Sequence, residues 1–182
     1  DLSEEKNSIY INHHEDFHAA STMKTPVMIE VFKQASAGKF SLQDSLIIKN
    51  QFKSILDDSS YSLELGRDSG EHLYEQIGQK RSIEDLVTDM IIYSSNLATN
   101  IIIELVDAKN VNKTMRNLGA KNINVLRGVE DMKAYEAGLS NSTTAYDLML
   151  IFEALATGNA VNPEADEKML NILRQQKHTD LI

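Results

Sequence analysis

Residues 97–106 form the stretch that most restricts how this chain folds. Apolar side chains dominate it, and they include the uninterrupted triplet Ile101, Ile102 and Ile103. In a helix these side chains point to almost all sides, and a helix that is apolar nearly all round is buried. We therefore expect this stretch to be the central helix of a folded domain, enclosed by other elements.

Further helices are predicted on both sides of this stretch, mainly from apolar residues at spacings of three and four. Ser82 and Asp85 have the form of a capping box at the start of one helix, and Gly38 ends another. Residues 8–12 alternate between polar and apolar and predict a half-buried strand, whereas the Ser-rich residues 57–67 predict an extended segment or a loop. The predicted helices cover residues 21–37, 42–48, 86–92, 96–106, 111–118, 144–156 and 163–174.

The composition is that of a folded globular chain with an acidic balance. Of the 182 residues 42% are hydrophobic, and the formal net charge is −9. Nucleic acids and anionic membrane surfaces require clustered Lys and Arg, so neither is expected as a partner. No apolar run is long enough to span a membrane, and Asp1 without a hydrophobic leader suggests a mature or trimmed chain. The chain has no Cys, and His13, His14 and His18 lack a carboxylate at a metal-ligand interval, so we expect neither a metal nor another cofactor.

Ser21 and Lys24 form the first candidate for catalytic chemistry. They are three positions apart at the start of the predicted helix 21–37, and therefore lie on one face of it. A neighbouring amine can take up the proton of a Ser hydroxyl as the oxygen attacks a carbonyl. Ser3 and Lys6 have the same spacing in a charged stretch, so spacing alone is weak. The alternative is a helix cap followed by a surface lysine.

Ser94 and Asn96 form a second candidate, in a tight connection between two apolar helical runs. Their side chains are expected to point into a cleft, where the Ser94 hydroxyl could relay a proton to a leaving nitrogen. The Asn96 amide could donate to a substrate carbonyl while its oxygen accepts from a nearby lysine. The alternative is that Ser95 or Asn96 caps the next helix. Tyr93 either lines the same cleft or packs in the interior.

Together, these motifs resemble those of the penicillin-interacting serine hydrolases, and most of all those of the class A β-lactamases. That family carries Ser-x-x-Lys, then Ser-Asp-Asn followed by Thr-Ala-Ala-Asn. Here the segment from Ser94 to Asn100 matches Ser, Asn, Ala and the final Asn, and Ser95 stands where the family has Asp. A third block, from Arg127 to Asn141, resembles the family's omega loop. The order and separation of the blocks fit the family from about residue 9 onward.

The resemblance implies a mainly α piece of the α+β β-lactamase/transpeptidase-like fold. Residues 1–40 correspond to the N-terminal part of its α/β domain with the nucleophile helix. Residues 41–182 correspond to its helical domain, with an omega-like loop at about 127–141. The family carries Lys-Thr-Gly or Lys-Ser-Gly on a later strand, and neither triplet occurs here. We therefore expect a C-terminally truncated fragment, inactive on its own, whose sheet a missing segment or a second copy completes.

The resemblance also implies acyl transfer without a cofactor. In the family, a Glu two residues after the omega-loop Arg positions the water that hydrolyses the acyl-enzyme. Here Glu130 is three residues after Arg127, and Glu136 is a weaker substitute. The expected catalytic residues are Ser21 as nucleophile, Lys24 as base, Ser94 as proton relay and Glu130 in deacylation, with Asn96 and Tyr93 as substrate contacts.

The resemblance finally implies substrates and a compartment. The expected activity is hydrolysis of a β-lactam amide by an exported bacterial enzyme, periplasmic or extracellular. One alternative is a D-alanyl-D-alanine peptidase or transpeptidase acting on cell-wall peptides. Another is a penicillin-binding sensor module without turnover. All three would bind a small molecule or a cell-wall peptide at the same site.

Overall fold

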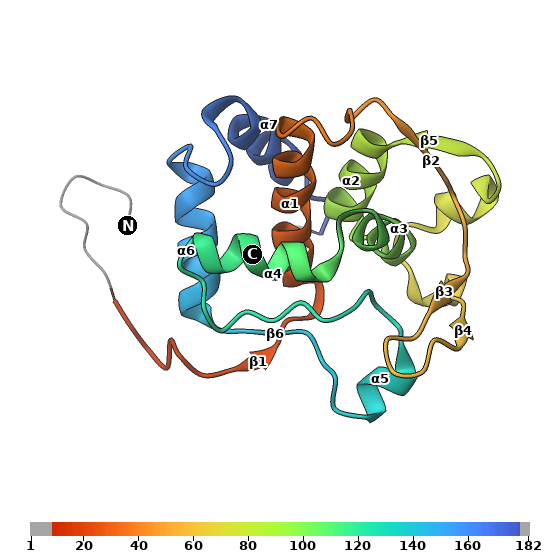
Figure 1. Ribbon diagram of the computed structural model, residues 1–182, viewed down its shortest axis with the longest axis horizontal. Helices are drawn as coiled ribbons and strands as arrows, with labels where there is room; N and C mark the ends of the chain where they lie inside the picture. The colour runs from red at the N-terminus through yellow and green to blue at the C-terminus, as the bar shows by residue number, and fades with distance from the viewer. Residues whose placement is uncertain (1–8, 179–182) are drawn as a thin grey trace.

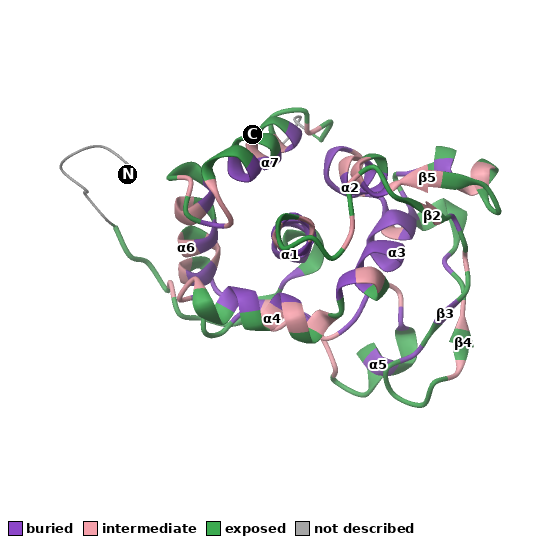
Figure 2. Ribbon diagram, turned by 45° about the horizontal axis from the view of Figure 1, so that its top comes forward, coloured by how far each residue is buried: buried purple, intermediate pink, exposed green. Residues whose placement is uncertain are grey.

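Helix α1 (Lys24–Ser36) lies at the centre of the fold, and the other long helices surround it (Figure 1). The computed structural model describes residues 9–178. Figure 2 views α1 almost end-on, inside a ring of helices. The remaining α-helices in the described residues are α2 (Ile83–Ile92), α3 (Asn96–Val106), α4 (Ala108–Asn117), α5 (Met132–Glu136), α6 (Ala145–Ala156) and α7 (Pro163–Leu173).

The central helix is α1 and not α3, which corrects the expectation from the isoleucine triplet. Ile101, Ile102 and Ile103 are buried as predicted, but α3 belongs to the ring around α1. Every residue of α1 from Lys24 to Phe32 is buried. Helix α1 reaches this position because its apolar side chains point to several sides and contact α2, α3, α4 and α7.

Side-chain caps explain where most of the long helices begin. A cap of this kind satisfies backbone amides that have no partner in the first turn. The caps are Ser82 on α2, Ser95 on α3, Asp107 on α4, Thr144 on α6 and Asn162 on α7. With one exception, each predicted helix agrees with the structure to within one turn.

The exception is the helix predicted at residues 42–48, which is wrong. Ser45–Ile47 is strand β2, paired antiparallel with β5 (Lys80–Ser82). Leu46 packs against the core and Ile48 is fully buried, whereas Ile47 between them is 56% exposed. This alternation is that of a strand. Its backbone groups bond to β5, a partner more than thirty residues away that local spacing does not reveal.

The strand predicted at residues 8–12 is also wrong, although Ser8 lies outside the described residues. Ile9 and Ile11 are exposed and in irregular structure, so the alternation buries nothing. The strand of this region is β1 (Phe17–His18), which pairs with β6 (Ser142–Thr143). A further hairpin pairs β3 (Phe52–Lys53) with β4 (Ser60–Tyr61). Among the helices of residues 9–178, none has the length and hydrophobicity to cross a membrane.

Candidate active site

The segment that carries Ser21 is held from both sides. Ser21 lies in a 3-10 turn (Ala20–Met23) that continues directly into α1. The turn follows β1, whose pairing with β6 joins it to the end of the omega-like loop, and the Ala19 amide donates to the Asn141 carbonyl at 2.9 Å. Ala20 has a φ of 45°, a left-handed conformation uncommon for a residue with a Cβ.

Lys24 brings the two predicted motifs together. Its ammonium donates to the Ser94 carbonyl at 2.6 Å, to Ser94 Oγ at 2.9 Å and to Asn96 Oδ1 at 3.1 Å. Ser94 Oγ in turn lies 2.9 Å from Ser21 Oγ. Among the described residues, no hydrogen bond joins the Lys24 amine to the Ser21 hydroxyl, although the Lys24 backbone amide donates to the Ser21 carbonyl. The lysine therefore reaches the candidate nucleophile through the hydroxyl of Ser94.

The environment of Lys24 weakens its hold on a proton. The side chain is only 2% exposed, and burial lowers its pKa from 10.5 to about 8. The charges of Asp68 and Glu130 oppose this effect in part, because each carboxylate favours the protonated amine. About one lysine in ten is then neutral at pH 7 and able to accept a proton.

Asn96 connects this cluster to Glu130. Its amide nitrogen donates to Glu130 Oε1 at 2.9 Å, while its oxygen faces Lys24. Glu130 has a φ of 60° and follows Val129, whose backbone amide and carbonyl are both bonded to the side chain of Asn100, at 2.7 and 3.0 Å. Glu130 thus faces Asn96, and Val129 occupies the position two residues after Arg127.

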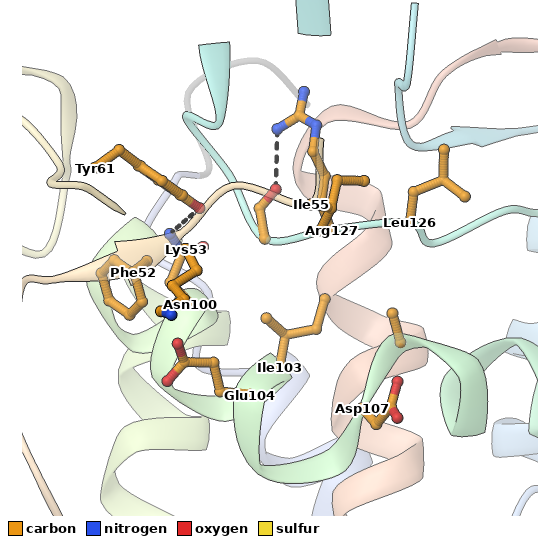
Figure 3. Close-up of a pocket in the computed structure, with 12 residues that line it drawn as sticks. Phe52, Lys53, Ile55, Tyr61, Asn100, Ile103, Glu104, Asp107, Leu126 and Arg127 are labelled. Atoms are coloured by element: carbon orange, nitrogen blue, oxygen red, sulfur yellow. Dashed lines mark hydrogen bonds between the residues drawn. The ribbon is translucent and has the colours of Figure 1, made fainter. Parts of the chain in front are cut away.

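The omega-like loop is closed at its base by Arg127 and Asn141. The Asn141 side chain accepts from the amides of Leu126 and Arg127 and donates to the Arg127 carbonyl. The Arg127 guanidinium donates to the carbonyls of Leu139 and Gly128, at 2.9 and 3.0 Å. Figure 3 shows the bond from Arg127 to the Gly128 carbonyl beside a cavity of about 280 Å³. It also shows the bond from Asn100 to the Tyr61 hydroxyl. The two ends of the predicted loop therefore meet.

A cavity of about 310 Å³ opens beside Ser21. One wall comes from the segment that carries Ser21 and the other from the omega-like loop. The lining residues are His18, Ala20, Ser21, Asn96, Arg127, Val129, Glu130, Met132, Tyr135 and Asn141. Tyr93 does not line it: the Tyr93 ring packs against His72, with 5.1 Å between ring centroids. Ser95 caps α3, as one alternative expected, while the side chains of Ser94 and Asn96 face Lys24.

Sequence reasoning missed Asp68 and Tyr135, and it considered His18 only as a metal ligand or a packing residue near Ser21. Asp68 is buried at the start of α3, where it accepts from the amides of Asn96 and Leu97. His18 contacts Ser140 at 2.7 Å through Nδ1. No local pattern marks any of the three, because each reaches the site through contacts between distant segments. Within residues 9–178, no cluster of three or more acidic, His or Cys side chains is arranged to hold a metal.

Comparison with known proteins identifies the family. The model of the β-lactamase enzyme family matches residues 1–182, while no curated protein sequence matches the chain. A β-lactamase from Sphaerobacter thermophilus is 29% identical, with a TM-score of 0.76 over 94% of this chain and 60% of that one. A mutant of PBP-A, solved as an acyl-enzyme complex with penicillin G, is 24% identical, with a TM-score of 0.73 over 93% and 58%.

A β-lactamase from Chitinophaga pinensis shows the same fold at 18% identity, with a TM-score of 0.77 over 96% of this chain and 62% of that one. The chain thus spans about three-fifths of the length of these structures. Its mainly helical architecture is the part of the β-lactamase and penicillin-binding fold that these structures share with it. The chain belongs to the β-lactamase enzyme family.

Proposed function

We propose that the protein is a penicillin-interacting serine hydrolase that forms an acyl-enzyme at Ser21 with a β-lactam amide. One observation carries the proposal: Ser21, Ser94 and Lys24 form a hydrogen-bonded chain that ends in a buried amine with a pKa of about 8. A base with a pKa near the working pH is well suited to proton transfer. The acyl-enzyme that a mutant of PBP-A forms with penicillin G on the same fold supports this reading.

In the proposed first step, Ser21 Oγ attacks the carbonyl carbon of the lactam. The Ser21 proton moves to Ser94 Oγ as the Ser94 proton moves to the neutral amine of Lys24. Hydroxyl hydrogens rotate freely, so the same two contacts serve transfer in both directions. When the tetrahedral intermediate breaks its C–N bond, Ser94 gives a proton to the leaving nitrogen and regains one from Lys24. The backbone amide of Ser21 is one proposed donor to the oxyanion.

Asn96 is the proposed anchor for the amide side chain of the substrate. Its amide nitrogen donates to Glu130 in the free protein, at the wall of the cavity beside Ser21. A substrate carbonyl arriving there can replace the carboxylate as acceptor. Met132 and Tyr135, about half exposed on the same wall, offer apolar surface to the rest of the ligand.

A second candidate is a D-alanyl-D-alanine peptidase or transpeptidase of the cell wall. Two observations favour it over a fast β-lactamase. Val129 occupies the position at which the family carries its water-positioning Glu, and Asn100 holds the backbone of Val129 there. The Glu130 carboxylate accepts from Asn96. Both arrangements favour a slowly hydrolysed acyl-enzyme. Since cell-wall peptides lie outside the bacterial cytoplasm, either function requires export.

Labelling of the full-length protein with a fluorescent penicillin tests the proposal. Mass spectrometry should find the adduct on the peptide that contains Ser21, and Ser21→Ala should abolish it. Ser3→Ala is the matched control, because Ser3 also precedes a Lys by three residues. Label that persists for hours supports the peptidase, and label lost within seconds supports the β-lactamase. Absence of any adduct on the wild-type protein, together with no consumption of the penicillin, would contradict both and favour a module without turnover.

A further inference from the structure

Asp68 lies in a loop outside the recognised motifs, at the start of α3. Its Oδ1 accepts from the amides of Gly70 and Asn96, at 2.8 and 2.9 Å, and its Oδ2 accepts from the amide of Leu97 at 2.8 Å. The side chain is only 4% exposed. Amides of a first helical turn have no partner within the helix, and they attract a negative charge. Asp68 therefore joins its loop to the beginning of α3.

The loop and the start of α3 are packed without spare room. A Cβ built on Gly70 would lie 2.4 Å from both Cβ and Oγ of Ser95. Ser95 is fully buried, and its hydroxyl lies 3.4 Å from Asp68 Oδ2. Tyr74 donates to the same oxygen at 3.1 Å. Position 95 thus carries a small side chain, and the carboxylate beside it comes from Asp68.

This contact lies directly beside Ser94 and Asn96. Ser94 has a φ of 57°, a strained conformation for a residue other than Gly, which persists only where the surroundings hold it. Asp68 binds the backbone two residues later, at the amide of Asn96. The carbonyl and hydroxyl of Ser94 and the side-chain oxygen of Asn96 are the three groups that receive the Lys24 ammonium.

We propose that Asp68 is a positioning residue that aims Ser94 and Asn96 at Lys24, supplying the carboxylate that the family motif carries at the position of Ser95. This inference rests on the proposed acylation of Ser21. Asp68 acts in two ways, which an experiment can separate. Its hydrogen bonds set the geometry of the connection, and its charge favours the protonated form of Lys24, together with that of Glu130.

The test is the rate of acylation of the full-length protein by a fluorescent penicillin, measured between pH 5 and 9 for wild type and Asp68→Asn. The amide cannot accept from both α3 amides, so the plateau rate should fall by at least about tenfold, as expected for misplaced catalytic groups. Loss of the charge makes Lys24 easier to deprotonate, with Glu130 as the remaining carboxylate facing it. The acid limb of the profile should therefore move to lower pH, which a merely structural role would not cause.

Asp166→Asn is the matched control. Asp166 is also a buried carboxylate, 1% exposed, and it binds two backbone amides, those of Ala160 and Val161, beside α7. This variant should be destabilised but keep the plateau and the acid limb of wild type. A wild-type protein that neither carries a Ser21 adduct nor consumes the penicillin would refute the proposed function itself. Unchanged plateau and acid limb in Asp68→Asn, with acylation of wild type intact, would refute only the role of Asp68.

An exchange variant keeps the proposal testable if Asp68 variants fail to fold. Asp68→Ser combined with Ser95→Asp moves the carboxylate to the cap position of α3, from which it can reach the second and third amides of the helix. The exchange should restore the fold, or at least a third of the rate lost in Asp68→Ser alone. An exchange variant no better folded and no faster than Asp68→Ser would overturn the proposal.

Discussion

Lys24→Met removes a buried charge from the proposed site while it keeps a long, unbranched side chain. In the folded protein burial lowers the pKa of Lys24 from 10.5 to about 8, whereas the unfolded chain keeps the ordinary value. Below about pH 10 the unfolded chain therefore holds the proton of Lys24 more tightly than the folded protein does. A charged Lys24 consequently lowers the free energy of unfolding.

The size of this effect follows from the two pKa values. A tenfold change in proton affinity corresponds to about 1.4 kcal/mol, so the charge costs roughly 3 kcal/mol at pH 7. As the pH rises through 8 the folded protein loses its proton first, and the cost decreases until the unfolded chain also deprotonates near 10.5. By pH 9.5 about 1.4 kcal/mol remains. The free energy of unfolding of wild type should rise by about 2 kcal/mol between pH 7 and 9.5, relative to Lys24→Met.

Urea denaturation of the full-length wild type and Lys24→Met at these two pH values measures the difference. The comparison cancels the titration of all other groups. Met leaves the oxygens of Ser94 and Asn96 without their donor, but this penalty is independent of pH and does not alter the change between the two conditions. An identical pH dependence in the two proteins would show that the Lys24 amine is not perturbed, and would remove the physical reason for its role as base.

Three further predictions concern Lys24, Glu130 and Asn141. Lys24→Arg keeps the charge but cannot accept a proton, so acylation in a stopped-flow assay should slow by about a hundredfold or more; a near-normal rate would contradict the role of Lys24. Glu130→Gln should leave the lifetime of the Ser21 adduct nearly unchanged, because the carboxylate faces Asn96; a much longer lifetime would instead make Glu130 the deacylating residue. Asn141→Ala removes three hydrogen bonds at the base of the omega-like loop, and urea denaturation should show a loss of about 2 kcal/mol; an unchanged midpoint would mean that the loop base is held by other contacts.

The helices and the two motifs were predictable because their signals are local. Apolar spacing, a capping Ser and a terminating Gly act within one or two turns, and α3 begins and ends where the sequence predicts. The spacing of Ser21 and Lys24 likewise identifies a candidate nucleophile and base. The resemblance adds the family, which the family match confirms.

Contacts between distant segments could not be predicted from such local signals. Strand β2 looked helical because its partner β5 lies far along the chain. The site itself shows the same limit, since Lys24 meets Ser94 rather than Ser21 only after α1 packs against α3. The sequence alone determines most of the helices and the chemical groups of the two motifs, because propensity and spacing are properties of neighbours. Only the tertiary structure decides that Asp68 lies at the start of α3 and that the pKa of Lys24 is low, because burial and charge proximity depend on which distant segments pack together.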